Sequence, residues 1–285
     1  MAQSSPRASR PADLPTSWWH ATFPPPVPND ALPAESDVVV IGGGLLGCWT
    51  AFWLAQRGVS ATVLEQEVVS WGATGRNGGF LTSGGALGYT TAIASFGRET
   101  ARAIWRLSED GRALAERTIA DEGIACDFRK PGTLALALSD DALASMTADA
   151  ALQREDGFRA DVLDRVSVQE LIATPLADDI AGAALAPDGG LLHSGRYLAG
   201  IAAAARRHGA RFVKATATSL TPVADGTSIQ TSAGIVRAGR VVVAVNAWSD
   251  ELVPALAGLV VPVRGQILAY EPVAPVFTTA IGTDI

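Results

Sequence analysis

The chain has 285 residues, 48% of them hydrophobic and 18% charged, enough apolar sequence for one large α/β domain or two smaller domains. Its formal net charge of -7 at pH 7 leaves no basic surface field, which argues against nucleic acid and anionic membranes as the main partners. The two cysteines, Cys48 and Cys126, show neither metal-ligand spacing nor a disulfide framework, so a reducing cytoplasm is the expected compartment. A small molecule is the expected ligand.

Residues 1–36 are expected to form an extended N-terminal arm. They contain eight prolines and no apolar stretch long enough for a signal sequence or an integral membrane segment. Within the stretch SWWHATFPPP, Trp18, Trp19 and Phe23 favour docking of the arm on the surface of the domain. His20 in the same stretch is interpreted as a bystander rather than a ligand.

The segment from Asp37 to Glu65 predicts a strand, a loop, a helix and a second strand. The β-branched run DVVVI is typical of a strand buried on both faces of a parallel sheet. Leu45–Gln56 predicts a helix, and Gly58 follows where a helix needs a left-handed residue to stop. The run SATVLEQ then predicts a second strand, parallel to the first, that ends on Glu65.

An amphipathic helix is predicted from Glu99 to Glu122, with Gly123 as its stop. Its apolar residues recur at helical spacing, which is typical of a helix covering a sheet. The expected apolar stripe consists of Ile104, Leu107, Leu114 and Ile119.

Residues 127–190 mix short strands and helices and are expected to form an inserted second domain. The run GTLALALS predicts a half-buried strand with Leu134, Leu136 and Leu138 on one face, followed by a helix capped near Ser139. In SVQEL, Ser167 and Glu170 have the spacing of a capping box.

The pattern of parallel strands returns after residue 190. A helix is predicted from Ser194 to His208 with Gly209 as its stop, followed by a strand at RFVKATA. The ADGT sequence predicts a hairpin turn, and RVVVAV predicts another strand that is buried on both faces.

The first loop carries the pattern G-x-G-x-x-G at Gly42, Gly44 and Gly47, directly between a strand and a helix. Such glycines allow a tight turn, close approach of backbone amides to a pyrophosphate, and close packing of helix on strand. Glu65 ends the next strand twenty-three positions after Gly42, where a carboxylate can accept hydrogen bonds from the hydroxyls of an adenosine ribose. This combination predicts a dinucleotide site.

An acidic residue at that position disfavours NADP, because it repels a 2′-phosphate, and leaves NAD and FAD. The loop WGATGRNGGF, with four glycines in ten residues, favours FAD. Its small residues can pass close to a flat ring, with Thr74, Arg76 and Asn77 as hydrogen-bond donors. An ordinary connecting loop would not need four glycines, because each glycine increases the conformational entropy lost on folding. NAD stays open on this evidence alone.

In the order DVVVIGGGLLG, VLEQ, WGATGRNGGF, GGLLHSGRYLAGIAAAARRHGA, VVVAVNAW and PVRGQILAYEP, the chain resembles the FAD-dependent D-amino-acid-oxidase-like superfamily. Within it, the resemblance is to the branch of gamma-glutamylputrescine oxidase and glycine oxidase, including the SWWHAT arm, and it extends from about Ser17 to Pro272. It implies an α/β fold: a Rossmann-like parallel-sheet FAD-binding domain with an inserted mixed-sheet α+β substrate domain.

The expected domain limits follow from this resemblance. After the arm, the FAD-binding domain takes 37–126 and 191–256, and the substrate domain takes 127–190 and begins again at 257–285. Members of the superfamily continue into further strands and a final glycine-rich loop, whereas this sequence stops at Ile285. A fragment, a truncated product and a cofactor site open on one side are all compatible with that end.

The resemblance also implies which residues bind FAD. The fingerprint glycines would bind the pyrophosphate, Glu65 the ribose, the backbone of Thr218 the adenine, and the second glycine-rich loop the flavin. The strand end at Asn246 to Trp248 would approach the flavin as well. The implied cofactor-binding residues are Gly42, Gly44, Leu46, Gly47, Glu65, Gln66, Thr74, Gly75, Arg76, Asn77, Gly78, Gly79, Thr218, Asn246 and Ala247.

The implied activity is oxidation of an amine or amino acid. Hydride would pass from the alpha carbon to flavin N5, giving an imine and then an aldehyde, and oxygen would be reduced to hydrogen peroxide unless another acceptor takes the electrons. Arg76, Arg264 and Trp248 are the candidate residues near the substrate, and Arg264 to Gln266 would begin a strand of the substrate chamber. An NAD-dependent dehydrogenase and a catalytically weak FAD-binding remnant remain the alternatives.

Two further residues are given structural interpretations. His193 precedes a helix and could reach a cofactor, but a turn histidine is the preferred interpretation. Cys48 lies at a helix start, where a thiolate would be stabilised, but is interpreted as a small buried hydrophobe. No metal-ligand set and no Ser-His-Asp arrangement stands out in the sequence.

Overall fold

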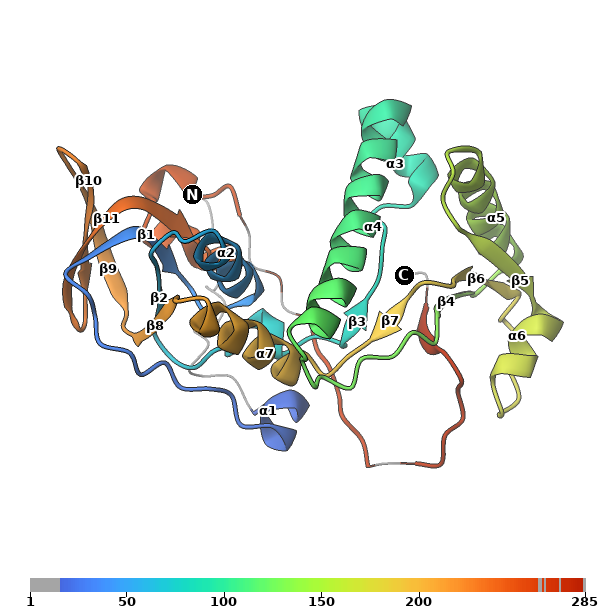
Figure 1. The fold of residues 1–285 in the computed structure, drawn as a ribbon. Helices are drawn as coiled ribbons and strands as arrows, with labels where there is room; N and C mark the ends of the chain where they lie inside the picture. The colour runs from blue at the N-terminus through green and yellow to red at the C-terminus, as the bar shows by residue number, and fades with distance from the viewer. Residues whose placement is uncertain (1–15, 261–262, 264, 272, 284–285) are drawn as a thin grey trace, which may run out of the picture. The chain divides into compact units, whose positions relative to one another are not determined.

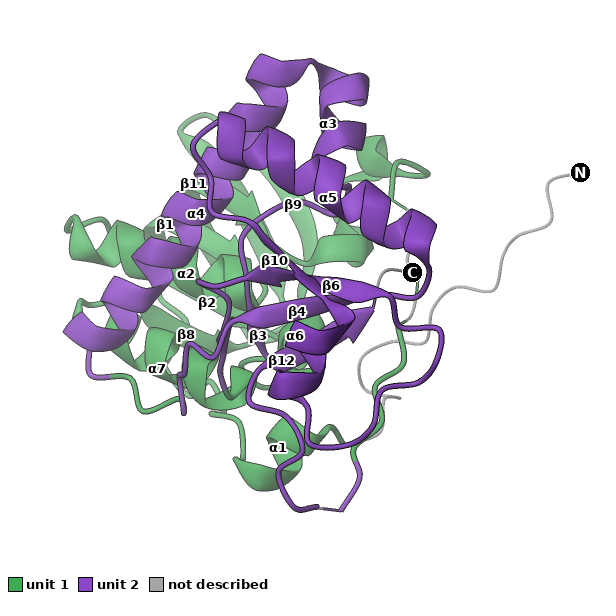
Figure 2. Cartoon of the chain, turned by 90° about the vertical axis from the view of Figure 1, so that its right-hand side faces the viewer, with its two compact units in different colours: residues 1–78, 124–126, 193–269 green, residues 79–123, 127–192, 270–285 purple. Residues whose placement is uncertain are grey.

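A computed structural model of the chain describes residues 16–260, 263, 265–271 and 273–283. The chain divides into two compact units, which are coloured separately in Figure 2. The first comprises residues 1–78, 124–126 and 193–269, and the second comprises 79–123, 127–192 and 270–285. Each unit is described by itself.

The first unit is built on a six-stranded sheet in the order β8-β2-β1-β11-β10-β9 (Figure 1). The first four strands of this order are parallel to one another. β10 pairs antiparallel with β11, and β9 pairs antiparallel with β10. The strands are β1 (Glu35–Ile41), β2 (Ala61–Glu65), β8 (Arg211–Lys214), β9 (Ala217–Val223), β10 (Gly226–Thr231) and β11 (Gly234–Val243).

Strand β1 is buried on both faces, as its β-branched sequence predicts. Val39 and Val40 point to opposite faces and are both fully buried. Helices α2 (Leu45–Gln56) and α7 (Ser194–Arg207) pack on each other, and α2 covers β1 and β2. An apolar cluster containing Val39, Leu64 and Ile229 fills the other face. The predicted parallel α/β unit is therefore confirmed, and the left-handed glycines end its helices at Gly58 (φ 76°) and Gly209 (φ 103°).

The prediction that RVVVAV is buried on both faces is wrong. Residues 241–245 are only half-buried. Strand β11 pairs with β1 as far as Val243, but β10 pairs with β11 only over residues 234–238, and α2 packs on β1 and β2. The end of β11 therefore receives less cover than its sequence suggests.

The second unit is built on a four-stranded mixed sheet in the order β12-β4-β6-β5, with a separate two-stranded ribbon of β3 and β7. β12 runs parallel to β4, and the other pairs are antiparallel. The strands are β3 (Phe80–Leu81), β4 (Thr133–Ala137), β5 (Asp161–Asp164), β6 (Gly182–Ala186), β7 (Gly190–Leu191) and β12 (Ala280–Thr283). The helices are α3 (Tyr89–Phe96), α4 (Arg98–Asp121), α5 (Asp140–Glu155) and α6 (Arg165–Leu171).

Residues 79–123 group with the second unit, whereas the sequence places them in the FAD-binding domain. The reason is the packing of helix α4. Trp105 of α4 contacts Tyr89 of α3 at 4.8 Å between ring centroids, and Phe158 lies against the same tyrosine at 5.9 Å. These aromatic contacts join α4 to the second unit.

The predicted apolar stripe of α4 is also partly wrong. Leu107 is 73% exposed and Ile104 is 38% exposed, while Trp105 is buried. Ile119 is buried as predicted. The stripe is displaced because the large ring of Trp105, which lies on the edge of the expected polar face, sets the orientation of the helix.

Local signals in this unit have mixed outcomes. Ser139 caps α5 as predicted, accepting a hydrogen bond from the Ala142 amide. The capping box at Ser167 is wrong: Asp164 is the N-cap, and its carboxylate accepts from the Ser167 amide at 2.8 Å. Leu138 lies beyond the end of β4 and is exposed, so only the first two leucines of the predicted stripe are buried.

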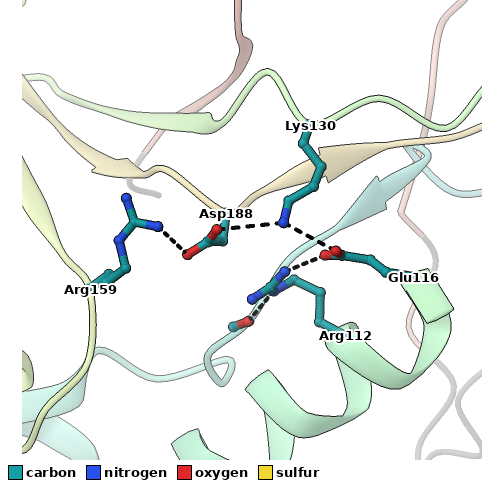
Figure 3. Close-up of polar contacts among 6 residues, drawn as sticks. Arg112, Glu116, Lys130, Arg159 and Asp188 are labelled. Carbon is teal, nitrogen blue, oxygen red and sulfur yellow. Dashed lines mark hydrogen bonds and ion pairs between the residues drawn. The ribbon is translucent and has the colours of Figure 1, made fainter.

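A chain of ion pairs connects α4 with the segments around β4 and β7 (Figure 3). Glu116 pairs with Arg112 and, at 3.1 Å, with Lys130. Lys130 also lies 3.5 Å from Asp188, which pairs with Arg159 at 3.0 Å. Only 10% of the Arg112 side chain is exposed, so Glu116 neutralises a cation that water reaches poorly.

Replacing Glu116 with Gln is expected to destabilise the protein by about 1–3 kcal/mol, because it leaves the largely buried Arg112 beside Lys130 without a carboxylate. A drop in Tm of about 2–4 °C per kcal/mol should be visible by calorimetry. Arg159→Gln is the matched control at the exposed end of the same chain of ion pairs, and a change below about 0.5 kcal/mol is expected there. Equal losses in the two variants would contradict this account.

Candidate dinucleotide site

The loop between β1 and α2 folds back so tightly that two of its glycines cannot carry a side chain. Gly42 has φ +112°, and a Cβ there would lie 2.6 Å from the carbonyl oxygen of Ala244. A Cβ on Gly47 would lie 1.9 Å from the carbonyl oxygen of Gly42. These contacts bring α2 directly against the carboxyl end of β1, as the fingerprint predicts.

Gly44 is different, because space is open beside it. Its φ of -82° suits any residue, and a Cβ would meet only the Thr74 hydroxyl, at 3.4 Å. Gly44 is the N-cap of α2 and offers no side chain to the amides of the first turn. The Leu45 amide donates to the Thr74 hydroxyl at 3.0 Å, while Leu46 is 62% exposed. A helix start of this kind favours an anion.

Glu65 lies at the end of β2, next to this helix start. Its Oε2 accepts a hydrogen bond from the Gly43 amide at 2.7 Å, and its Oε1 accepts one from the Glu67 amide at 2.8 Å. Burial raises the pKa of the carboxyl above its ordinary value, and the hydrogen bonds from both amides act against that shift. Each carboxylate oxygen keeps capacity for another donor, so two ribose hydroxyls can be accepted. Gln66, the next residue, is exposed.

The second glycine-rich loop, which we define as residues 70–78, folds over the first. The Ser70 amide donates to the Gly43 carbonyl at 3.1 Å, and Thr74 accepts from Leu45 as described. Gly75 is enclosed, since a Cβ there would lie 2.2 Å from the Ser70 carbonyl oxygen and 2.3 Å from His20 Nε2. The structure therefore brings residues 42–47, Glu65 and the second loop together, as predicted.

The polar side chains of the second loop are engaged within the protein. Arg76 Nε donates to the Trp71 carbonyl at 3.0 Å, and its guanidinium lies 4.8 Å from the centre of the Trp71 ring. Burial lowers the pKa of Arg76. Asn77 donates to the Thr74 carbonyl at 2.7 Å and accepts from the Ser194 hydroxyl at 2.6 Å. Both side chains thus hold the loop, a role that the sequence did not reveal.

The N-terminal arm docks on this loop and on the start of α7, through the short helix α1 (Trp18–Thr22). Trp19 Nε1 donates to the Asn77 carbonyl at 2.7 Å, and the Thr22 hydroxyl lies 3.0 Å from His193 Nε2. His193 is the N-cap of α7, where its Nδ1 accepts from the Arg196 amide. Docking was predicted, but its location was not, and a structural role for His193 agrees with these contacts.

The end of β11 meets the first loop where Gly42 approaches Ala244. Immediately beyond, Asn246 has φ +53°, a left-handed value that asparagine adopts more readily than most residues other than glycine. Asn246 is exposed, and Ala247 and Trp248 are half-buried in the 3-10 helix η3 (Asn246–Glu251). Residues 246–248 therefore follow the same carboxyl edge of the sheet as the fingerprint.

Thr218 lies at a β-bulge. In the β9–β10 ladder Ser219 pairs with Gln230 and Ala217 with Thr231, so Thr218 between them has no partner residue in register. A bulged residue can direct its backbone away from the ladder. This geometry fits the predicted backbone contact with an adenine, and the exposed side chain only donates to the Gln230 carbonyl, at 3.2 Å.

Two predicted residues cannot be placed with this group. Arg264 lies outside the described residues, and Gly79 belongs to the second unit, where its carbonyl accepts from the Leu192 amide.

Cys48 lies inside the first unit, fully buried, with its thiol 3.5 Å from the Gly43 carbonyl. Burial raises the pKa of this thiol, which agrees with its interpretation as a small buried hydrophobe.

Comparison with known proteins decides what kind of dinucleotide site this is. The family model described as "DAO: FAD dependent oxidoreductase" matches residues 37–283, nearly the whole chain. The chain belongs to the DAO family of FAD-dependent oxidoreductases. FAD is the cofactor of this family, so the prediction of FAD over NAD is confirmed at the level of the family.

Individual relatives agree with the family. The chain is 31% identical to the gamma-glutamylputrescine oxidoreductase of Escherichia coli, over 82% of this chain and 55% of that protein. It is 25% identical to the glycine oxidase of Geobacillus kaustophilus, over 86% of this chain and 64% of that protein. The chain thus spans well under two thirds of the first of these relatives.

The fold is that of solved DAO structures. The crystal structure of glycine oxidase from Geobacillus kaustophilus superposes with a TM-score of 0.69, at 21% identity, over 88% of this chain and 66% of that chain. The predicted α/β fold is confirmed by this likeness. The residues of this DAO chain also fit a dinucleotide. The space beside Gly44 lies at the start of α2, and the Glu65 carboxylate adjoins it.

Substituting alanine at Gly44 and at Gly47 should separate binding from folding. Gly47→Ala is expected to destabilise the protein by about 3 kcal/mol or more, because the added methyl overlaps the Gly42 carbonyl. Gly44→Ala should leave Tm unchanged but weaken FAD binding about tenfold or more, because its methyl enters the space for the pyrophosphate. Thermal unfolding and flavin fluorescence titration measure the two effects. Similar behaviour of the two variants would contradict the distinction.

Glu65→Gln is expected to weaken FAD binding about 10- to 100-fold, equivalent to ~1.5–3 kcal/mol for hydrogen bonds to a charged acceptor. Ribose hydroxyls favour the ionised carboxylate, so wild-type affinity should be constant at high pH and fall as the pH drops through the pKa of Glu65. Since that pKa is raised, the fall should begin above the range of an ordinary glutamate. Titrations at several pH values should show no such fall in the variant.

Proposed function

We propose that this chain binds FAD and takes part in the oxidation of an amine or amino acid. The observation that carries the proposal is the open start of α2 beside Gly44, next to the Glu65 carboxylate, in a chain of the DAO family. Such a site accepts the diphosphate and ribose that every dinucleotide carries.

The chain's own residues would hold FAD in three places. Amides at the start of α2, including that of Leu46, would bind the pyrophosphate, and Glu65 would accept the ribose hydroxyls. The backbone of Thr218 would meet the adenine. The flavin would lie against the second loop, from Thr74 to Gly78, and against Asn246 and Ala247.

Bound FAD would supply the two-electron acceptor, taking hydride at N5 from the alpha carbon of a neutral amine. The resulting imine would be hydrolysed to an aldehyde or keto product, and reoxidation by oxygen would form hydrogen peroxide, unless another acceptor is used. The protein's part is to bind, orient and exclude water. Trp248, Arg76 and Arg264 remain our candidates for groups near the substrate.

The substrate class rests on the relatives. The two named above are a gamma-glutamylputrescine oxidoreductase and a glycine oxidase, whose substrates both carry an amine nitrogen. A small-molecule amine or amino acid is therefore the proposed substrate here. No particular amine is favoured by the described residues.

We propose a cytoplasmic location. Both cysteines are buried free thiols, as expected in a reducing compartment. Among the helices that the structure describes, none is long and apolar enough to cross a membrane.

The proposal is tested by the visible spectrum of the purified chain after incubation with FAD and removal of the excess. Flavin absorbance retained with the protein, and bleached when an amine is added without oxygen, is the expected result. A panel of amines and amino acids should include glycine and gamma-glutamylputrescine, with peroxide measured after air is readmitted.

Retained flavin that no amine bleaches would favour the FAD-binding remnant. A chain that retains no flavin would contradict the proposal. Glu65→Gln is the matched control for specific flavin binding, since it changes the ribose contact without removing the loop.

A further inference from the structure

His20 of the N-terminal arm lies inside the cofactor-binding unit, although the sequence suggested a bystander. It is 7% exposed. Its Nε2 lies 3.2 Å from the Ser70 carbonyl oxygen and 3.3 Å from the Ser70 hydroxyl. Because a carbonyl can only accept, Nε2 must carry the hydrogen and donate to Ser70.

The ring of His20 is neutral in this setting. Burial, and next the charge of Arg76, lower the pKa of the ring, and only the hydrogen bond to the Ser70 backbone opposes them. Its Nδ1 is buried without a hydrogen-bond partner in the described part of the chain. A purely apolar ring would avoid the cost of that buried acceptor. Packing alone therefore does not account for a histidine here.

The contact partner of His20 is a strained residue. Ser70 has φ +70°, a left-handed conformation that residues other than glycine rarely adopt. Such strain persists only where surrounding contacts hold it. Ser70 is held from two sides: its amide donates to the Gly43 carbonyl at 3.1 Å, and its carbonyl accepts from His20.

The face of the His20 ring makes a second contact with the same loop. It stacks on Trp71, with ring centroids 5.4 Å apart and planes inclined by 2°. Gly75 lies against the same Nε2 edge of the ring, since a Cβ there would lie 2.3 Å from His20 Nε2. The arm is also tied to the chain just before Ser70, because the Val69 amide donates to the Pro26 carbonyl at 3.0 Å. The arm thus reaches the fingerprint loop through a single intermediate residue, Ser70.

We infer that His20 is a positioning residue of the cofactor site: it holds Ser70 in its left-handed conformation and so fixes the second loop over the fingerprint. This inference rests on the proposed function, since it assigns the arm a part in FAD binding. Without the histidine donor, Ser70 would relax toward ordinary backbone angles. The loop would then lose its bond to Gly43 and its fixed position beside the start of α2.

The inference makes a specific claim about rescue. Glycine adopts positive φ without strain, so Ser70→Gly should remove the need for His20. Within the described part of the chain, the Ser70 hydroxyl forms a hydrogen bond only with His20, so its loss breaks no other hydrogen bond. His20→Gln provides a second rescue, because its amide can donate to the Ser70 carbonyl from a position close to that of Nε2.

The test measures FAD affinity by fluorescence titration, and hydrogen exchange of residues 70–78 in the FAD-free protein. His20→Phe should weaken FAD binding about tenfold, the effect of losing one hydrogen bond to a buried acceptor, and should speed exchange in the loop. Both the His20→Phe, Ser70→Gly double variant and His20→Gln should bind FAD within about threefold of wild type. The matched control is His208→Phe, an exposed histidine in the same unit that packs edge-on against Phe52.

The outcomes separate this inference from the proposed function. If wild type binds FAD and His20→Phe binds it equally well, the inference is overturned and the proposed function stands. If His20→Phe is weak and neither rescue restores binding, positioning through Ser70 is overturned. If His208→Phe weakens binding as much as His20→Phe, the effect belongs to the unit as a whole and the inference also fails. A wild-type chain that binds no FAD overturns both.

Discussion

The contact between Gly47 and the Gly42 carbonyl is the constraint on which the cofactor site depends. A Cβ at Gly47 would lie 1.9 Å from that oxygen, so only glycine lets α2 start directly against the end of β1. This close approach places the Leu45 and Gly43 backbone where Thr74 and Ser70 of the second loop can bond to them. The positions of the second loop and of the arm therefore depend on the contact between Gly47 and the Gly42 carbonyl. A change in that contact would shift both segments.

Sequence patterns predicted the elements well where burial is a local property, and poorly where it depends on neighbours in the sheet. DVVVI and RVVVAV have nearly the same composition, yet β1 is buried on both faces and residues 241–245 are half-buried. The difference is that β10 pairs with β11 only over residues 234–238 and does not extend alongside residues 241–243, which no pattern within RVVVAV encodes. Trp105 acts in the same way in α4: its contact with Tyr89, sixteen positions earlier in the sequence, orients the helix away from the leucine-based stripe.

The residues of the candidate site also differ in how far they could be predicted from the sequence. The fingerprint glycines and Glu65 were predictable, because each is required by a contact within one strand-loop-helix-strand unit. The support from His20 was not, since its partner Ser70 is fifty positions away and the contact needs the arm to fold back. Arg76 and Asn77 were read as donors for a ligand, but their side chains bond to the protein itself. A sequence shows which side chains can donate hydrogen bonds, but the acceptors that they reach are set by the fold.

This division bears on how a DAO chain distinguishes its cofactor. On the proposed function, the start of α2 and Glu65 would meet the diphosphate and ribose, which NAD and FAD share, so they would not discriminate between the two cofactors. Discrimination between the cofactors would then come from the residues that meet the remaining half of the molecule, which we propose include the second loop. That loop keeps its shape through Ser70, and Ser70 keeps its left-handed conformation through contacts on both sides. On this proposal, the choice of cofactor would depend in part on His20, which lies outside both glycine-rich loops, because the glycines that let the second loop approach a flavin also allow it more backbone conformations.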